Sequence, residues 1–488
     1  MTSPSGDINY DVVDPSNKWK ILRVQWRYGL WAIWTSIGSM MLGFDYVIGA
    51  QLATLSEFQK TFGVQQTDGT WIIPAMYLAA WNSIGLGCDV VASWLAAPWL
   101  EKYGRKPLIL FSALASVVGV ALQQLAPDWR VHLAGRGVNV EPSVVVSRAS
   151  SGLDNKWQWW TPVIGMYIFP ALLLVIWPFF PESPYWLVRE QRYDDAHKSL
   201  RTMYGLADQR LFDIEIKRLR KDVRDDRPPR ALLGIIPSPA AELQCFDKAN
   251  RKRTLTAICA ASAQQVIGAS FVIGNATYFL ALIGIDKYFN ASVALYVVML
   301  VASAAAFPLS EIVGRRTLIV PSQFALCFFL LLIGVMGCVP NHTGAGWGIL
   351  TLIYLWAVIY QVSIGATGFV LASEVATLRL RAVTQALVTM SNGVWGLVMQ
   401  FTIPYMINPD AGNLGGKIGF IFFGLGLIVS ILGWWLYPET KGVRFEKLDE
   451  LYAKGVAPRH FKKEVSSEDA ENDLFPKKTA VTEAVTEE

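Results

Sequence analysis

The sequence predicts an all-α polytopic membrane protein of two helical bundles joined by a polar linker, and three observations lead to this fold class. Hydrophobic residues make up 53% of the 488 residues and charged residues only 17%, whereas soluble proteins carry about 25% charged residues. The mean hydropathy is positive, at +0.34. Long charge-free stretches alternate with charged segments, and in lipid such a stretch satisfies its backbone only as a helix. Soluble enzymes, disordered chains and nucleic-acid binders do not fit this composition.

Charged residues divide the chain into ten apolar stretches, each long enough for a helix of about 20 residues to cross a bilayer. The stretch at 317–373 exceeds the length of one membrane helix, and the turn-like sequence at 339–346 divides it into two. The ten predicted spans lie at 28–56, 69–100, 107–127, 157–181, 254–285, 288–310, the two parts of 317–373, 382–409 and 418–438.

The distribution of positive charge predicts the orientation. If both termini are cytoplasmic, 36 of the 43 Lys and Arg residues fall on the cytoplasmic side, as the positive-inside rule requires. Two glycosylation sequons, at Asn290 and Asn341, then lie outside.

The polar segments also give the expected domain boundaries. These are a cytoplasmic N-terminal tail at 1–27, an N-terminal bundle of about four helices at 28–180, a cytoplasmic linker at 181–253, a six-helix C-terminal bundle at 254–437 and a cytoplasmic C-terminal tail at 438–488. The five cysteines form no CxxC pair and the four histidines are scattered, so we expect neither a disulfide framework nor a metal site. No nucleophile–base set or phosphate loop is present in the sequence, so we do not expect an enzyme.

A charged motif occurs twice between predicted spans on the cytoplasmic side. The copies are Glu101-Lys-Tyr-Gly-Arg105-Lys106 and Glu311-Ile-Val-Gly-Arg315-Arg316. Arginines in such a loop can bind carboxylates and helix C-termini of neighbouring spans and so hold the cytoplasmic side closed. Two copies at equivalent places indicate a parallel internal repeat of the two bundles.

Further segments carry a family resemblance. They are Pro181-Glu182-Ser-Pro-Tyr-Trp-Leu187, Gln264-Gln265 with Gly268, Glu374-Val-Ala-Thr-Leu-Arg379-Leu-Arg381 and Pro438-Glu439-Thr-Lys-Gly442. With the paired loops, these segments resemble the major facilitator superfamily and, within it, the sugar porter branch. Residues 43–46, 268–270 and 277–279 look most like fungal α-glucoside (maltose-type) permeases.

The resemblance implies a cytoplasmic gate formed by the charged residues of these segments. Its expected members are Glu101, Arg105, Lys106, Glu182, Glu311, Arg315, Arg316, Glu374, Arg379, Arg381 and Glu439.

The resemblance also implies twelve helices, whereas only about ten are predicted. Residues 135–139 resemble the start of the family's fourth helix, but residues 144–148 resemble only the end of its fifth. The fourth and most of the fifth helix are therefore expected to be missing, together with the loop that would be the counterpart of 374–381. A mis-spliced gene model, a degenerate gene and a natural ten-helix variant are the alternatives.

Ionisable residues inside spans are costly and therefore mark function. Asp45 resembles the carboxylate that proton-coupled members use, and Arg136 resembles its partner on the fourth helix. The alternative for Asp45 is a structural polar residue where the helix unwinds near Gly43, and Asp89 is expected to be structural.

Neutral polar residues in the C-terminal bundle are expected to bind sugar hydroxyls. The resemblance points to Gln264, Gln265, Gln361 and Asn392. Ser270 and Gly393 replace larger residues of hexose transporters, which favours a disaccharide. The alternative role for Gln264 and Gln265 is hydrogen bonding between helices.

The expected function is proton-coupled uptake of α-glucosides by alternating access. The expected partners are the lipid bilayer, protons and a small sugar; no cofactor is expected beyond the proton gradient, and no nucleic acid. We expect a monomer in the plasma membrane. A hexose facilitator, a non-transporting sugar sensor and an inactive product of a truncated gene are the alternatives.

Overall fold

The fold is known from a computed structural model. It describes residues 26–66, 69–138, 155–205, 213, 215–217, 219–220, 244–247, 250–339, 342–377, 380–441, 443, 445–461 and 464. These fall into two compact units. Unit 1 comprises residues 1–241, 273–293 and 396–414, and unit 2 comprises residues 242–272, 294–395 and 415–488.

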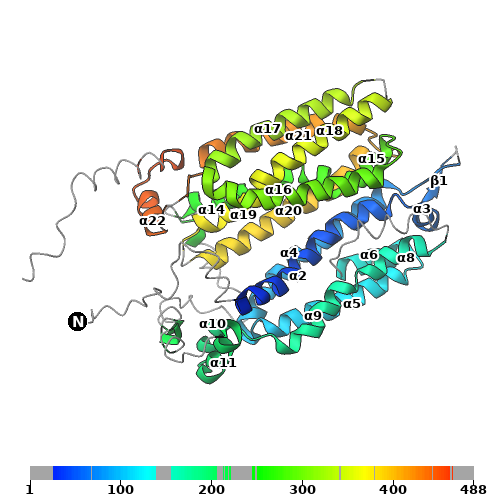
Figure 1. Ribbon diagram of the computed structural model, residues 1–488. Helices are drawn as coiled ribbons and strands as arrows, with labels where there is room; N and C mark the ends of the chain where they lie inside the picture. The colour runs from blue at the N-terminus through cyan, green and yellow to red at the C-terminus, as the bar shows by residue number, and fades with distance from the viewer. Residues whose placement is uncertain are drawn as a thin grey trace, which may run out of the picture. The chain divides into compact units, whose positions relative to one another are not determined.

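The N-terminal part of unit 1 is a series of helices with one small ribbon (Figure 1). The helices are α2 (Trp26–Leu52), α3 (Ser56–Phe62), α4 (Ala75–Tyr103), α5 (Lys106–Gln124), α6 (Trp129–Val138), α8 (Trp157–Gly165), α9 (Ile168–Ile176), η1 (Trp177–Phe179), α10 (Pro184–Arg189) and α11 (Tyr193–Tyr204). The strands β1 (Val64–Gln65) and β2 (Trp71–Ile72) pair antiparallel, Val64 opposite Ile72. This ribbon was not predicted.

Aromatic side chains hold the beginnings of several unit 1 helices together. Phe58 and Phe62 of α3 pack against Trp81 of α4, and all three contact His132 of α6. Trp159 of α8 packs on both phenylalanines. Burying such large apolar rings stabilises the packing of these four helices.

The remaining helices include the longest apolar ones together with several short turns. They are α14 (Arg251–Val266), η2 (Ser270–Gly274), α15 (Ala276–Leu282), α16 (Tyr288–Val313), α17 (Arg315–Met336), α18 (His342–Tyr360), η3 (Gln361–Gly365), α19 (Ala366–Val375), α20 (Arg381–Ile407), η4 (Gly415–Lys417), α21 (Ile418–Leu436), α22 (Phe445–Ala453) and η5 (Pro458–His460). Residues 273–293 and 396–414, which include α15 and the end of α20, belong to unit 1.

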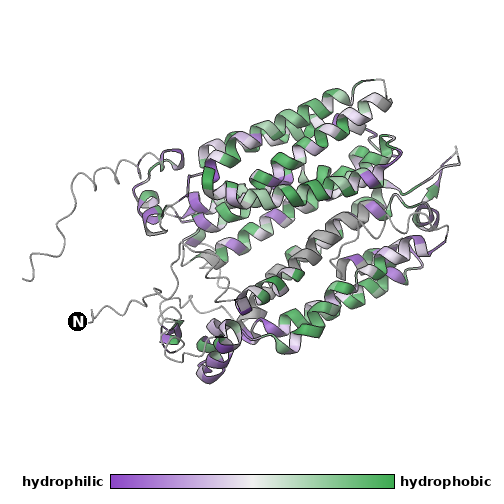
Figure 2. Ribbon diagram, in the orientation of Figure 1, coloured by the Kyte–Doolittle hydropathy of each residue, from purple (hydrophilic) through white to green (hydrophobic). Residues whose placement is uncertain are grey.

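Small residues allow close packing in unit 2. α17 lies against α18 and α21, and α14 lies against α19 and α21 (Figure 1). A Cβ at Gly419 of α21 would lie 2.4 Å from the Leu330 carbonyl oxygen of α17, so only glycine fits this contact. Apolar residues cover the middle of these helices, and hydrophilic residues gather in α10, α11 and α22 (Figure 2).

The all-α prediction is confirmed apart from the two-residue strands. Seven helical stretches of the described residues are long and apolar enough to cross a membrane, at 106–124, 157–179, 288–310, 315–336, 344–375, 383–407 and 415–436. The predicted turn within 317–373 is confirmed, because α17 ends at Met336 and α18 begins at His342. The total of ten spans stays a prediction.

Two helices are broken by π-helical turns. The predicted span at 254–285 consists of α14, η2 and α15, and the span ending at 373 consists of α18, η3 and α19. Gly268, at φ +106°, ends the first segment, and Ser363 has non-helical φ and ψ of −107° and −107° in η3. Such breaks leave backbone carbonyl groups without their usual helical partners.

The described part of α6 has ten residues. It covers the stretch that resembles the start of a fourth helix, and residues 139–154, where the missing helices are expected, lie outside the described residues.

Candidate functional site

The two glutamines expected to bind sugar lie buried at the end of α14, in unit 2. Gln264 and Gln265 are 6% and 8% exposed. Gln264 Nε2 donates to the Ile364 carbonyl oxygen at 2.9 Å, and Gln265 Oε1 accepts from Ser270 Oγ at 2.6 Å. Each amide thus makes a structural hydrogen bond, as the alternative interpretation expects. An amide has two N–H donors and an acceptor oxygen, so the bond to Ile364 does not use the full hydrogen-bonding capacity of Gln264.

The Ile364 carbonyl group, which accepts the hydrogen bond from Gln264, lies in the π-helical break η3. A Cβ at Gly368, one turn further, would lie 2.7 Å from Gln264 Nε2. The absence of a side chain at Gly368 therefore makes room for the bond to Ile364. Gln361, at the start of η3, donates its Nε2 to Ser303 Oγ of α16 at 2.5 Å. Both sequence-predicted residues are thereby tied to neighbouring helices of unit 2.

Asn392 of α20 differs from these residues. Its Oδ1 is buried and, within the described part of the chain, has no hydrogen-bond partner. The same holds for Nε2 of Gln385, which lies seven residues earlier in α20. Seven residues are nearly two helical turns, so both amides lie on one side of α20, about 10 Å apart along its axis. Gln385 was not predicted; a neutral amide inside an apolar span was the available signal.

Arg136, the expected proton-coupling partner, is 3% exposed in α6 of unit 1. Its Nε donates to the carbonyl oxygen of Trp81 in α4 at 2.8 Å. Asp45 lies in α2, but its side chain is outside the described residues, so its pairing with Arg136 stays a prediction.

Several other expected residues cannot be placed. The side chains of Asp89, Glu101, Glu311 and Arg381, and residues Arg379 and Asn341 as a whole, lie outside the described residues. Asn290 is exposed in α16.

The first copy of the charged loop joins α4 to α5 in unit 1. Gly104 turns the chain at φ +85°. The backbone N–H groups of Arg105 and Lys106 then donate to the two carboxylate oxygens of Glu182, at 2.9 and 3.0 Å. Glu182 thus caps α5, which is favourable for a negative charge at a helix N-terminus. The Arg105 side chain donates from Nη1 to the hydroxyl oxygen of Ser183 at 2.9 Å.

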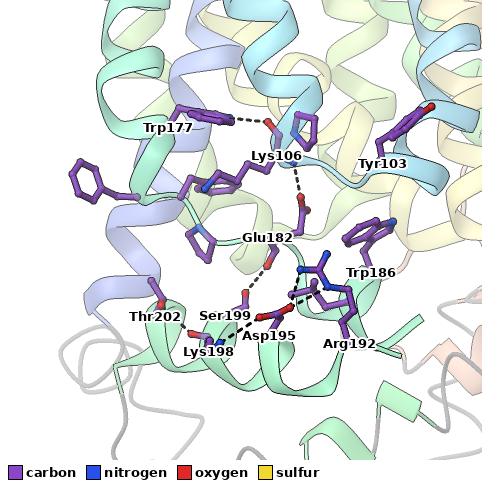
Figure 3. A pocket seen from close by; sticks show the side chains of 15 residues that line it. Tyr103, Lys106, Trp177, Glu182, Trp186, Arg192, Asp195, Lys198, Ser199 and Thr202 are labelled. Atoms are coloured by element: carbon purple, nitrogen blue, oxygen red, sulfur yellow. Dashed lines mark hydrogen bonds and ion pairs between the residues drawn. The ribbon is translucent and has the colours of Figure 1, made fainter. Parts of the chain in front are cut away.

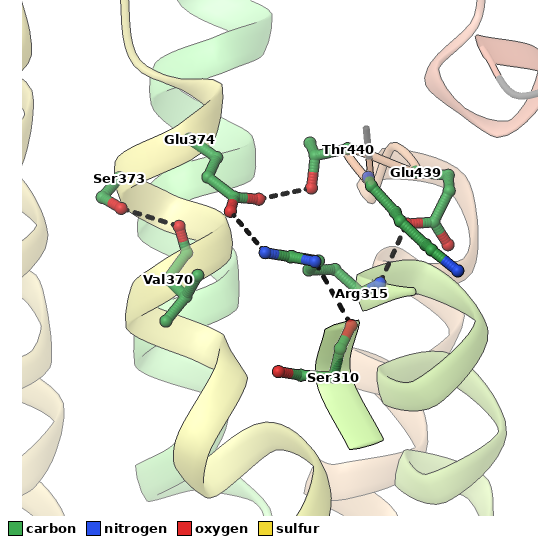
Figure 4. A network of polar contacts seen from close by, with 8 residues as sticks. Ser310, Arg315, Val370, Ser373, Glu374, Glu439 and Thr440 are labelled. Carbon is green, nitrogen blue, oxygen red and sulfur yellow. Dashed lines mark hydrogen bonds and ion pairs between the residues drawn. The ribbon is translucent and has the colours of Figure 1, made fainter. Parts of the chain in front are cut away.

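The second copy joins α16 to α17 in unit 2 (Figure 4). Gly314 turns the chain at φ +102°, and Glu439 accepts from the backbone N–H groups of Arg315 and Thr317 at 2.8 and 3.3 Å. The Arg315 side chain forms an ion pair with Glu374 at 3.0 Å. Thr440 Oγ1 donates to the other oxygen of Glu374 at 2.5 Å.

Arg316 completes this second network. Its Nη1 donates to the Tyr437 carbonyl oxygen and its Nη2 to that of Trp434 at 2.8 Å. Glu374, Arg315, Arg316 and Glu439, four members of the expected gate, therefore lie together around the N-terminal end of α17. The capping role of Glu182 and Glu439 was not predicted, although each follows a proline in a segment that resembles the family.

Unit 1 also contains a polar network that was not predicted. Asn82 of α4 donates to Asn275 Oδ1 at 3.2 Å, and Asn275 Nδ2 donates to Gln400 Oε1 of α20 at 3.0 Å. Near the start of α4, Asp410 accepts from the Ala75 N–H at 3.0 Å, and Asn408 donates to the Ile73 carbonyl oxygen at 3.0 Å. Amides within apolar spans were again the only signal.

Known proteins resemble this chain over most of its length. A family model described as "Sugar (and other) transporter" matches residues 31–139 and 143–452. The MFS transporter fmqE of Aspergillus fumigatus is 24% identical, covering 88% of this chain and 86% of the relative. The alpha-glucosides permease MPH3 of Saccharomyces cerevisiae is 26% identical over 88% and 78%, and the maltose permease MAL31 is 32% identical over 61% and 49%.

Solved structures share the fold. The xylose transporter XylE from E. coli in an inward open conformation superposes with a TM-score of 0.65 at 16% identity, covering 87% of this chain and 99% of that chain. The proton:xylose symporter XylE bound to 6-bromo-6-deoxy-D-glucose gives 0.63 at 14% identity, with 88% and 99% covered.

The matches also bear on the expectation that two helices are missing. The match to MPH3 runs over 485 aligned positions, whereas 88% of the 488 residues is about 430, so about 55 positions have no residue in this chain. For fmqE, with 474 positions, the same difference is about 45. Two membrane helices with a short loop have about this length.

Proposed function

The chain belongs to the sugar porter branch of the major facilitator superfamily, and on this premise we propose that it carries α-glucosides such as maltose across the membrane together with protons. The relatives named as α-glucoside and maltose permeases support the substrate class. In this proposal both termini are cytoplasmic, the protein acts as a monomer in the plasma membrane, and the domains have the boundaries expected from the sequence.

The observation that carries the proposal is the unpartnered amide oxygen of Asn392. A buried acceptor without a donor destabilises a protein by about 1–3 kcal/mol, and a ligand hydroxyl would remove that penalty. Gln264, Gln265 and Gln361 add neutral donors and acceptors in the same unit. Neutral amides suit a neutral polyhydroxylated ligand, because a buried charge would require a counter-charge that a sugar lacks.

The mechanism is alternating access with a proton taken up at Asp45. The broken helices α14–α15 and α18–α19 allow each outer segment to move against its inner segment. Asn392 binds the sugar, and Gln385, two turns nearer the start of α20, offers a second amide along the route toward the cytoplasm. The pair Arg315–Glu374 opens when the sugar leaves on that side.

A second candidate is an inactive protein that lacks two helices. The interruption of the family match between residues 139 and 143 supports a loss at this point. The number of unmatched positions in the alignment with MPH3 fits the length of two membrane helices. In this view the chain keeps the fold of the C-terminal bundle and has lost the N-terminal half of its gate.

Uptake into proteoliposomes separates these candidates. We expect radiolabelled maltose to accumulate faster with acid outside than at equal pH, and glucose to accumulate much less. Asn392→Leu should lower maltose uptake at least about tenfold, because it removes the acceptor. Asn290→Leu changes an exposed asparagine and is the matched control, expected to transport as the unchanged chain does. Asp45→Asn should abolish the pH dependence.

Each result has a defined meaning. Maltose uptake that is unaffected by Asn392→Leu contradicts the binding role. Accumulation that does not respond to pH contradicts proton coupling. If the chain is inert but a chimera carrying residues 137–150 replaced by the longer MPH3 stretch transports maltose, the second candidate is correct.

A further inference from the structure

Unit 1 contains a cavity that the sugar site does not use, and two of the expected gate residues, Lys106 and Glu182, line it. Its volume is about 500 Å³, and it lies between the start of α5, the end of α9 with η1, and the helices α10 and α11 (Figure 3). Its polar lining includes Lys106, Arg192, Lys198, Glu182 and Asp195.

The two carboxylates of the cavity are already engaged. Both oxygens of Glu182 accept backbone N–H groups of the α5 cap. Asp195 accepts from Arg192 Nε and Nη2, at 3.0 and 2.8 Å, and lies 3.5 Å from Lys198 Nζ. The hydrogen bonds from Arg192 hold the pKa of the Asp195 carboxyl below its ordinary value. One carboxylate is thus shared by two cations, which leaves positive charge at this wall.

Lys106 supplies a third cation from the opposite wall. Its Nζ donates to the Pro178 carbonyl oxygen at 3.0 Å and lies 5.0 Å from the centre of the Trp177 ring. Within the described part of the chain its ammonium forms no ion pair. Counting all five charged side chains, the cavity has an excess of one positive charge.

The upper rim of the cavity is aromatic and lies at the end of a membrane span. The span at 157–179 ends at Phe179, whose side chain is 73% exposed. Trp177 lines the same rim. Aromatic residues at a span end mark the level of lipid headgroups. The cations can bind an anionic group, and the aromatic side chains beside them can contact an apolar chain or a ring attached to that group.

We propose that this cavity binds a phosphate ester, with its phosphate between Lys106, Arg192 and Lys198. Phosphate oxygens accept the remaining N–H donors of these three side chains, and charge-assisted bonds of this kind are strong. The ester comes either from an anionic phospholipid of the cytoplasmic leaflet or from a soluble sugar phosphate. Lys106 is the last residue of the first charged loop and the first residue of α5. A ligand bound to Lys106, Arg192 and Lys198 would therefore connect this loop to α11.

Binding to the purified full chain in phosphatidylcholine nanodiscs tests the proposal. The probes are dioctanoyl phosphatidylinositol 4-phosphate for the lipid source and glucose 6-phosphate for the soluble source, with dioctanoyl phosphatidylcholine as the zwitterionic control. We expect one of the two phosphate esters to bind at least about tenfold more tightly than the control, with weaker binding at high salt.

Variants locate the binding. Arg192→Gln with Lys198→Gln should weaken binding at least about tenfold, whereas Arg192→Lys with Lys198→Arg should retain most of it. Lys60→Gln with Lys287→Gln removes two exposed positive charges elsewhere and should leave binding unchanged. Binding of neither ester, or equal loss in the two glutamine pairs, overturns the proposal. A thermal unfolding curve for each variant confirms that a loss of binding is not a loss of fold.

Discussion

The two charged loops share one backbone device and differ in what the arginine side chain binds. In each, a glycine with positive φ precedes a helix whose first N–H groups are capped by a glutamate from a distant Pro-Glu segment, Glu182 for α5 and Glu439 for α17. The Arg315 side chain also forms an ion pair with Glu374, which lies near the end of α19. Arg105 binds the hydroxyl of Ser183.

This difference shows that the helix cap and the ion pair depend on different segments of the chain. The cap needs only the glycine loop and the Pro-Glu segment, and both copies have them. The ion pair needs a third segment, which in the N-terminal half is expected between the fourth and fifth helices, where residues 139–154 lie outside the described residues. Among the described residues, the helix cap is therefore present in both units, and the ion pair of the loop arginine is seen in unit 2.

The largest effect is expected from the glycines. Gly314→Ala and Gly104→Ala force a side chain into left-handed backbone and place a Cβ 2.7 or 2.8 Å from the capping glutamate. Each should lower the free energy of unfolding in detergent by about 2–3 kcal/mol. Gly284→Ala is the matched control, since Gly284 has φ +81° with no atom within 4 Å of the added Cβ. If Gly314→Ala is as mild as Gly284→Ala, the carboxylate is not held against the loop.

Replacing the capping carboxylates should give a smaller effect. Glu439→Gln and Glu182→Gln keep one acceptor oxygen but lose the negative charge at the helix N-terminus, which should cost about 1–2 kcal/mol. Hydrogen exchange measures this locally: the Arg315 N–H in one variant and the Lys106 N–H in the other should exchange about tenfold faster. Faster exchange in α17 alone would show that the two caps are not equivalent.

The smallest effect should distinguish the two arginines. A double-mutant cycle of Arg315→Lys with Glu374→Gln should give a coupling energy of about 1 kcal/mol, because the side chains of Arg315 and Glu374 are only 17% and 21% exposed. The cycle of Arg105→Lys with Ser183→Ala should give a coupling near zero, because this contact is exposed. Equal couplings would remove the contrast between the loops.

The family resemblance placed Arg315 and Glu374 in one cytoplasmic gate, and the structure joins their side chains in an ion pair. Sequence reasoning did not predict that Glu182 and Glu439 bind backbone N–H groups, since a motif shows charges but not the turn that exposes an amide. It named Gln264 and Asn392, yet missed Asn275 and Gln400. Their chain positions, 125 residues apart, give no hint of the hydrogen bond that joins them.

The bond from Gln264 to the Ile364 carbonyl has an evolutionary consequence. The acceptor belongs to the main chain, so the acceptor oxygen remains when the side chain at position 364 changes, and only the packing around this buried side chain limits its size and shape. At Gly368 the opposite holds, because any larger residue would displace the Gln264 amide. In a diverging set of such transporters, variation at 364 would therefore adjust the surroundings of Gln264 without losing its orientation, whereas a change at 368 would require a compensating change at 264.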